Sequence, residues 1–140
     1  MKILIPIDGS EHSKKALEKA KTLGAALKAD ITILNVLNPS VDLRTMQNRT
    51  FYDEINKNSK LRAQEIIDNG MKLMSDYPGK VEPVSKVGDA VSEIISFAED
   101  GNFDLVIMGS RGAGLFSRTL LGSVSDKVIH HIKTSVLIVK

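Results

Sequence analysis

The chain contains no cysteine and no tryptophan, and aromatic residues make up only 4% of its 140 residues. Without cysteine, no disulfide, thiol nucleophile or cysteine-ligated zinc site can form, a composition that suits a reducing cytoplasm. The scarcity of aromatics removes the stacking platforms that single-stranded nucleic acids need. The net charge of +2 arises from 19 basic and 17 acidic residues that lie interspersed along the chain. A nucleic-acid partner is therefore disfavoured.

Long apolar runs are also missing. The apolar run that follows Lys2 is too short for the core of a signal peptide, and no stretch approaches the roughly 20 residues that span a bilayer. We therefore expect a cytoplasmic protein without a membrane contact. The length suits one domain that buries its own core.

Short β-branched runs alternate along the chain with longer segments whose apolar residues recur every three or four positions. The latter pattern predicts helices within about 14–28, 53–75 and 90–100 and from about 123 onward. Strands separated by crossover helices run parallel, so we expect a doubly wound, Rossmann-like α/β sheet. Pro83 cannot donate a ladder hydrogen bond, which places the third strand at an edge. The five expected strands are 2–7, 31–37, 81–87, 105–108 and 136–139.

One connection is unusually long. Residues 38 to about 52 are mixed and polar, whereas most connections contain two to six residues. This segment is either a surface excursion or a lid over a ligand, because loops after strand C-termini border the binding edge of an open sheet.

Glycines cluster after the fourth expected strand, in the stretch Gly109-Ser110-Arg111-Gly112-Ala113-Gly114-Leu115, and Gly122-Ser123-Val124-Ser125 opens the last helix. Without Cβ atoms, glycines let backbone amides approach an anion closely. A helix N-terminus adds free amides and a positive dipole end, so this pattern indicates a phosphate site. The alternative is structural: the glycines serve a turn, and Ser123 caps its helix.

The spacing of Gly109, Gly112, Gly122 and Ser123 resembles the nucleotide motif of the ATP-binding universal stress proteins. The resemblance extends over residues 1–140 as a single domain, from the opening 3–10 through 104–112 to the closing strand 135–139. It implies a sheet of the adenine nucleotide alpha hydrolase-like type with strand order 3-2-1-4-5.

The same resemblance implies a role for each part of the motif. Asp8 would bind the ribose hydroxyls, and adenine would lie against Pro6 and Val36, with Ile7 also among the nucleotide-binding residues. Gly109 would line the ribose side, residues 110–115 would wrap the phosphates, and residues 122–125 would close the far side. Relatives often have histidine where this chain has Asn35, so the resemblance assigns no polar contact with adenine there. From the residues alone, Asp8 could instead be a turn residue that caps the first helix.

The implied function is that of a nucleotide-regulated stress-response module that binds ATP, with Mg²⁺ held mainly by the phosphates. Relatives pair the last strand with its twofold mate, so residues 135–139 predict a homodimer. No Walker A lysine and no dedicated catalytic residues occur, although slow hydrolysis stays compatible with the sequence. The alternative is an adenylating or ATP-hydrolysing enzyme of the same fold. No protein metal site is expected, and His130 and His131 should divide between the surface and the core of the last helix.

Overall fold

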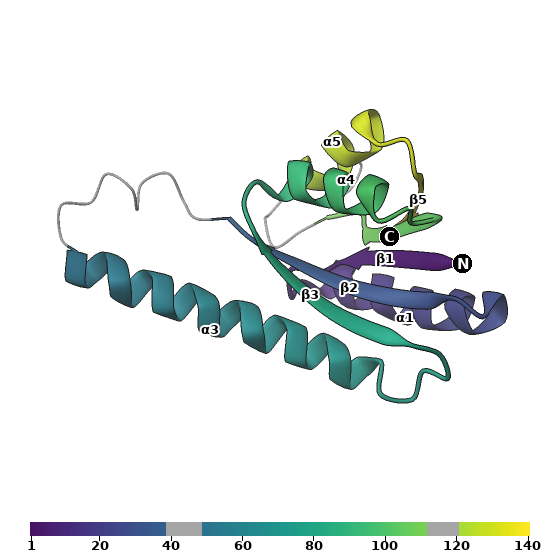
Figure 1. The fold of residues 1–140 in the computed structure, drawn as a ribbon, viewed down its shortest axis with the longest axis horizontal. Coiled ribbons are helices and arrows are strands. Elements are labelled where there is room, and N and C mark those ends of the chain that lie inside the picture. Colours follow the sequence, from purple (N-terminus) through teal and green to yellow (C-terminus); the bar gives the residue numbers. More distant parts are fainter. Residues whose placement is uncertain (39–48, 112–120) are drawn as a thin grey trace.

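A computed structural model describes residues 1–38, 49–111 and 121–140, and of residues 49–52 only the backbone. Five parallel strands form one sheet in the order β3-β2-β1-β4-β5 (Figure 1). This order confirms the predicted topology. The strands are β1 (Lys2–Pro6), β2 (Asp30–Leu37), β3 (Val81–Val87), β4 (Leu105–Gly109) and β5 (Ser135–Val139). The helices are α1 (Glu11–Leu27), α3 (Arg49–Leu73), α4 (Ala90–Asp100) and α5 (Ser123–His131).

Helices cover both faces of the sheet because successive strand residues point to opposite sides. On one face, Ile3 and Ile5 of β1 pack with α1 and α3, and α3 runs along the lower side of the molecule in Figure 1. On the other face, Leu4 of β1 and Leu34 of β2 pack with α4 and α5. The central strands are therefore apolar on both sides, as a doubly covered parallel sheet requires.

The two sheet edges differ in polarity. β3 carries Pro83 and exposed Glu82, and its edge position confirms the prediction from the proline. β5 forms the other edge, and its residues 136–139 are all apolar and half-buried. Such an edge offers unpaired backbone groups to another strand.

The ends of α1 and α4 follow ordinary capping rules, and both ends of α3 differ from the expected 53–75. Ser10 caps α1 by accepting the Ser13 N–H, and Asp89 caps α4 by accepting the Ser92 N–H. α3 begins at Arg49 rather than near residue 53. No glycine or proline occurs within 49–52, so nothing local opposes the additional turn.

The expected division of the two histidines of α5 was wrong. His130 and His131 are both exposed, and each ring Nδ1 lies 2.7 Å from the carbonyl oxygen four residues earlier. α5 ends at His131, so the inward position after Val128 falls on half-buried Ile132 instead.

The lid or excursion expected over 38–52 falls mainly on residues 39–48, outside the described residues. In the described part of the chain, no helix combines the length and the apolarity that a bilayer crossing requires.

Candidate nucleotide-binding site

A crevice opens at the carboxyl edge of the sheet, between β1 and β4. The strand order reverses direction between these two strands, which is where open α/β sheets bind ligands. β1 and β4 pair only through Ile3 with Leu105 and Leu4 with Val106, whereas β1 and β2 pair along five positions. The two strands therefore separate toward their carboxyl ends and leave space between the segments that follow them.

This space is a cavity of about 250 Å³ on the α4 and α5 side of the sheet, which we call the α4–α5 cavity. The end of β1, the end of β4 and the start of α5 all border it, although β1 and α5 are more than 100 residues apart in the sequence. Its lining residues are Pro6, Ile7, Asp8, Ser13, Leu34, Val36, Ala90, Ile94, Met108, Gly109, Arg111 and 122–125.

Most residues predicted for the nucleotide meet in this cavity. They include the end of β1, Val36 of β2, Gly109 and Arg111 after β4, and the first residues of α5. Ser110 is buried and is not among the lining residues. The predicted phosphate-loop residues Gly112, Ala113, Gly114 and Leu115 lie outside the described residues. That the assembled residues bind ATP stays a prediction.

The N-terminus of α5 borders this cavity. Ser123, Val124 and Ser125 all line it, and the first intrahelical bond runs from the Asp126 N–H to the Gly122 carbonyl. The amides of the three preceding residues therefore have no acceptor within the helix. Gly122 occupies the N-cap position without a side-chain cap bond, so the interpretation of Ser123 as a cap was wrong.

The two serine hydroxyls of this turn differ in their partners. Ser123 is exposed. The buried Ser125 Oγ lies 3.1 Å from each of the carbonyl oxygens of Ser110 and Gly122, which share its single hydroxyl proton. Ser125 therefore ties the start of α5 to the end of β4. Ser123 lines the cavity and makes no such bond among the described residues.

Ser110 connects the segment after β4 to three other elements. Its N–H donates to the Val139 carbonyl at 2.9 Å, and its carbonyl accepts the Gly122 N–H at 2.6 Å. Its hydroxyl lies 3.4 Å from His12 Nδ1 of α1. The backbone that would meet a phosphate is thus held between β5, α5 and α1.

Asp8 lies exposed on the turn between β1 and α1. Its Oδ1 accepts the Ser10 N–H at 2.9 Å, which forms a turn stabilised by its own side chain. The cap of α1 is Ser10, so the interpretation of Asp8 as the capping residue was wrong. The second carboxylate oxygen of Asp8 has no protein partner among the described residues and can accept hydroxyls from a ligand.

Asn35 lies on the opposite face of β2 from Val36. It is buried, and its Nδ2 donates to the Ile7 carbonyl at 2.8 Å. The Asn35 amide therefore holds the segment after β1 in place from the face of β2 opposite Val36. Val36 lines the cavity, and Asn35 does not.

Gly109 is required by packing as well as by the cavity. A Cβ built on it would lie 2.7 Å from both the carbonyl carbon and oxygen of His12, which are backbone atoms. Real Cβ atoms do not approach backbone this closely, so α1 could not lie against β4 with any larger residue there.

Sequence reasoning missed five lining residues: Ser13, Leu34, Ala90, Ile94 and Met108. Ala90 and Ile94 are one turn apart on α4, and their apolar periodicity predicted the inward face but not the cavity. Asp8 and Arg111 are the ionisable groups of the described lining. The rest of the lining is apolar on the α4 side, and on the α5 side it consists of the first residues of that helix.

Comparison with known proteins decides the family. The model of the universal stress protein family matches residues 1–140. The chain belongs to the universal stress protein family. Relatives include universal stress protein YxiE of Bacillus subtilis, which is 31% identical over 99% of this chain and 98% of its own length. Universal stress protein MJ0577 of Methanocaldococcus jannaschii is 30% identical over 99% of this chain and 94% of its own length.

Solved structures agree with this assignment. The structure of MJ0577 superposes with a TM-score of 0.84 at 32% identity and covers 99% of this chain and 94% of its own. A universal stress protein crystallised in complex with cAMP superposes with a TM-score of 0.75 at 25% identity, over 100% of this chain and 97% of its own.

Proposed function

We propose that this universal stress protein is a cytoplasmic, homodimeric module that binds ATP in the α4–α5 cavity and acts through the bound nucleotide rather than by catalysis. The observation that carries the proposal is the meeting of Asp8 with the N-terminus of α5 across the β1–β4 crevice. The relative crystallised with cAMP supports an adenine nucleotide as the ligand class.

The base and ribose have matching partners on the β1 and β2 side. Pro6 and Val36 offer apolar surface to the adenine ring, and Ala90 and Ile94 of α4 widen that surface. The Asp8 carboxylate accepts hydrogen bonds from the ribose hydroxyls, which a charged acceptor strengthens.

The phosphates have partners on the α5 side. The free amides of residues 123–125 and the positive end of the α5 dipole attract an anion, and the Ser123 hydroxyl adds a donor. Arg111 lines the same cavity and offsets phosphate charge.

Magnesium fits this donor set as a companion of the nucleotide. Mg²⁺ prefers oxygen ligands and keeps several waters, so it commonly binds through substrate phosphates and one or two carboxylates. Asp8 is the carboxylate of the described lining. Apart from water, most ligands of the ion would therefore be phosphate oxygens of the nucleotide.

The decisive test is identification of the small molecules released when the freshly purified protein is denatured, followed by calorimetry with ATP. We expect ATP to be released intact and to bind again. Incubation with ATP followed by product analysis separates the enzyme class, since AMP and pyrophosphate would indicate an adenylating enzyme. Absence of adenine nucleotide in both experiments would overturn the proposal.

The homodimer is proposed through β5. Its apolar, half-buried residues 136–139 form a sheet edge, and a twofold mate would satisfy the unpaired backbone groups. Sedimentation velocity at micromolar concentration should give a dimer. A monomer with and without ATP would contradict this part of the proposal.

A further inference from the structure

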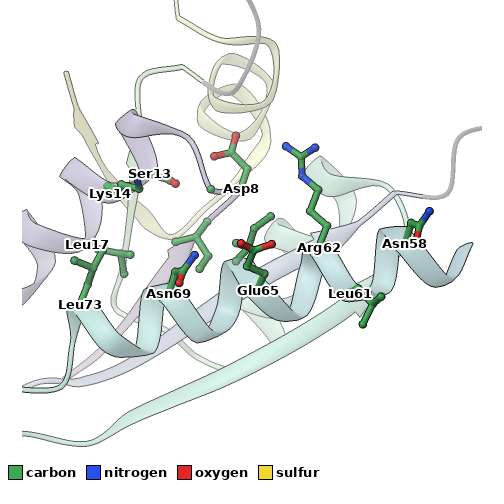
Figure 2. Close-up of a pocket in the computed structure, with 14 residues that line it drawn as sticks. Asp8, Ser13, Lys14, Leu17, Asn58, Leu61, Arg62, Glu65, Asn69 and Leu73 are labelled. Carbon is green, nitrogen blue, oxygen red and sulfur yellow. The ribbon is translucent and has the colours of Figure 1, made fainter. Parts of the chain in front are cut away.

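A second and larger hollow lies on the other face of the sheet, between α1 and α3. Its volume is about 550 Å³, and we call it the α1–α3 groove (Figure 2). The carboxyl-terminal part of α3 packs on the sheet through Ile67 and Gly70, and Met74 just after the helix joins the same core. The amino-terminal part extends past the carboxyl edge of the sheet (Figure 1). The groove is the wedge between this overhang and α1.

The groove has an apolar floor and a charged rim. Leu17 of α1, Leu73 of α3 and Ile7 after β1 form the floor near the core. Asp8, Lys14, Arg62 and Glu65 bring two charges of each sign to the rim, together with the amides of Asn58 and Asn69. Arg62 rises from α3 on the side where Asp8 lies (Figure 2).

The rim charges are only partly used within the protein. Lys14 pairs with Glu11 at 3.0 Å. Among the described residues, no ion pair involves Arg62, Glu65 or Asp8. An arginine fork binds a carboxylate in a bidentate manner, and carboxylates bind an ammonium group. Such a rim is complementary to a ligand that carries both charges.

We propose that the α1–α3 groove binds a small zwitterion with an apolar body, of the class of apolar dipeptides. The ligand carboxylate pairs with Arg62, and its ammonium group pairs with Glu65 and Asp8. Its apolar side chains pack against half-buried Leu73 at the groove floor. The volume falls within the roughly 300–1,000 Å³ of small-molecule sites.

The groove and the α4–α5 cavity share one wall, the turn between β1 and α1. Ile7, Asp8 and Ser13 line both spaces. Gly9 of this turn has φ +83°, and a Cβ on it would lie 3.1 Å from Ile66 Cγ1, so α3 rests against the turn. This step rests on the proposed function: an ammonium group held by Asp8 competes with the ribose hydroxyls, so the two ligands weaken each other reciprocally.

Calorimetry of the purified full chain with leucyl-leucine tests the groove without any nucleotide. We expect saturable binding, and at least about tenfold weaker binding of N-acetyl-leucyl-leucinamide, whose two charges are blocked. Arg62→Ala should weaken leucyl-leucine about tenfold. Lys60→Ala removes the same charge from an exposed position of α3 outside the groove and should change nothing.

Three results would overturn the site. They are no binding up to about 10 mM dipeptide, equal binding of the blocked peptide, and wild-type binding by Arg62→Ala. Asn69→Trp is a second variant, because Asn69 is exposed and an indole there fills the groove. With its helical circular dichroism retained, this variant should lose the dipeptide, and undiminished affinity would again contradict the proposal.

The coupling is measured by titrating ATP at saturating dipeptide. We expect ATP affinity to fall severalfold. Unchanged ATP affinity refutes the coupling and leaves the groove measurement standing. Absence of ATP binding under all conditions refutes the proposed nucleotide function instead, and the dipeptide titration remains the test of the groove.

Discussion

The α4–α5 cavity and the α1–α3 groove lie on opposite sides of one turn, and they are built in different ways. Backbone amides, glycines and short side chains make most of the polar surface of the cavity, with Asp8 and Arg111 as its charges. Side chains make the polar rim of the groove: Arg62 and Glu65 come from α3, Lys14 from α1 and Asp8 from the turn after β1. A site made of backbone groups tolerates few substitutions, because its ligand must approach the main chain closely. Exposed side chains at the rim of a groove can be substituted without disturbing the fold.

Two glycines, one in each region, give the largest expected contrast. Gly109→Ala drives a Cβ against the His12 backbone at 2.7 Å, whereas Gly70→Ala meets only the flexible Ile7 Cδ1 at 2.9 Å. We expect a loss of about 3 kcal/mol of unfolding free energy for Gly109→Ala. Gly70→Ala should stay within about 1 kcal/mol of the wild type, because alanine favours the helix. Urea unfolding measures both, and equal losses would contradict the distinction between backbone and side-chain contacts.

Asp8 belongs to both regions, and its substitution should act on ligands more than on the fold. Asp8→Ala removes a charged acceptor from the ribose position and should weaken ATP by about 1–3 kcal/mol. Glu11→Ala is the matched control, since Glu11 is an exposed carboxylate of the adjacent first turn of α1 that lines neither space. Calorimetry with ATP should separate the two variants. The same affinity in both would remove Asp8 from the site.

The two serines of α5 separate a structural hydroxyl from a ligand hydroxyl. Ser125→Ala loses the buried donor to the Ser110 and Gly122 carbonyls and should cost about 1 kcal/mol of stability. Ser123→Ala, at an exposed position without a cap bond, should leave stability unchanged and lower ATP affinity severalfold. Thermal unfolding with and without ATP distinguishes them. A stability loss in Ser123→Ala would assign that hydroxyl a structural role.

The smallest expected effect is on the stability of the fold at acidic pH. Hydrogen bonds from the Ser92 N–H and hydroxyl lower the pKa of Asp89, the N-cap of α4, below its usual value. The folded pKa lies below the unfolded one, so the stabilisation is present above about pH 4 and is lost as the pH falls through the folded pKa. Ala90 of the cavity follows this cap directly. Asp89→Asn should flatten the acid limb of the unfolding free energy. An unaltered limb would show that other carboxylates carry the acid sensitivity.

Local patterns in the sequence were sufficient for the strands, the helices and the glycine-rich part of the α4–α5 cavity, whereas the strand order and the other cavity residues came from the family resemblance. The β-branched runs, the helical periodicity and Pro83 predicted the strands, the crossovers and the β3 edge, because these depend on residues close together in the chain. The glycine spacing after β4 identified the family for the same reason: it is a contiguous motif. The start of α3 was misplaced by four residues, since helix boundaries depend on weak local preferences.

Contacts between distant segments decided the rest. Asn35 and Val36 are neighbours in sequence, yet β pleating sends one to the Ile7 carbonyl and the other to the cavity. The α1–α3 groove has no motif, because it arises from how far one long helix extends past the sheet edge. Periodicity determines which face of an element is buried, and only tertiary packing determines what that face meets and where space remains.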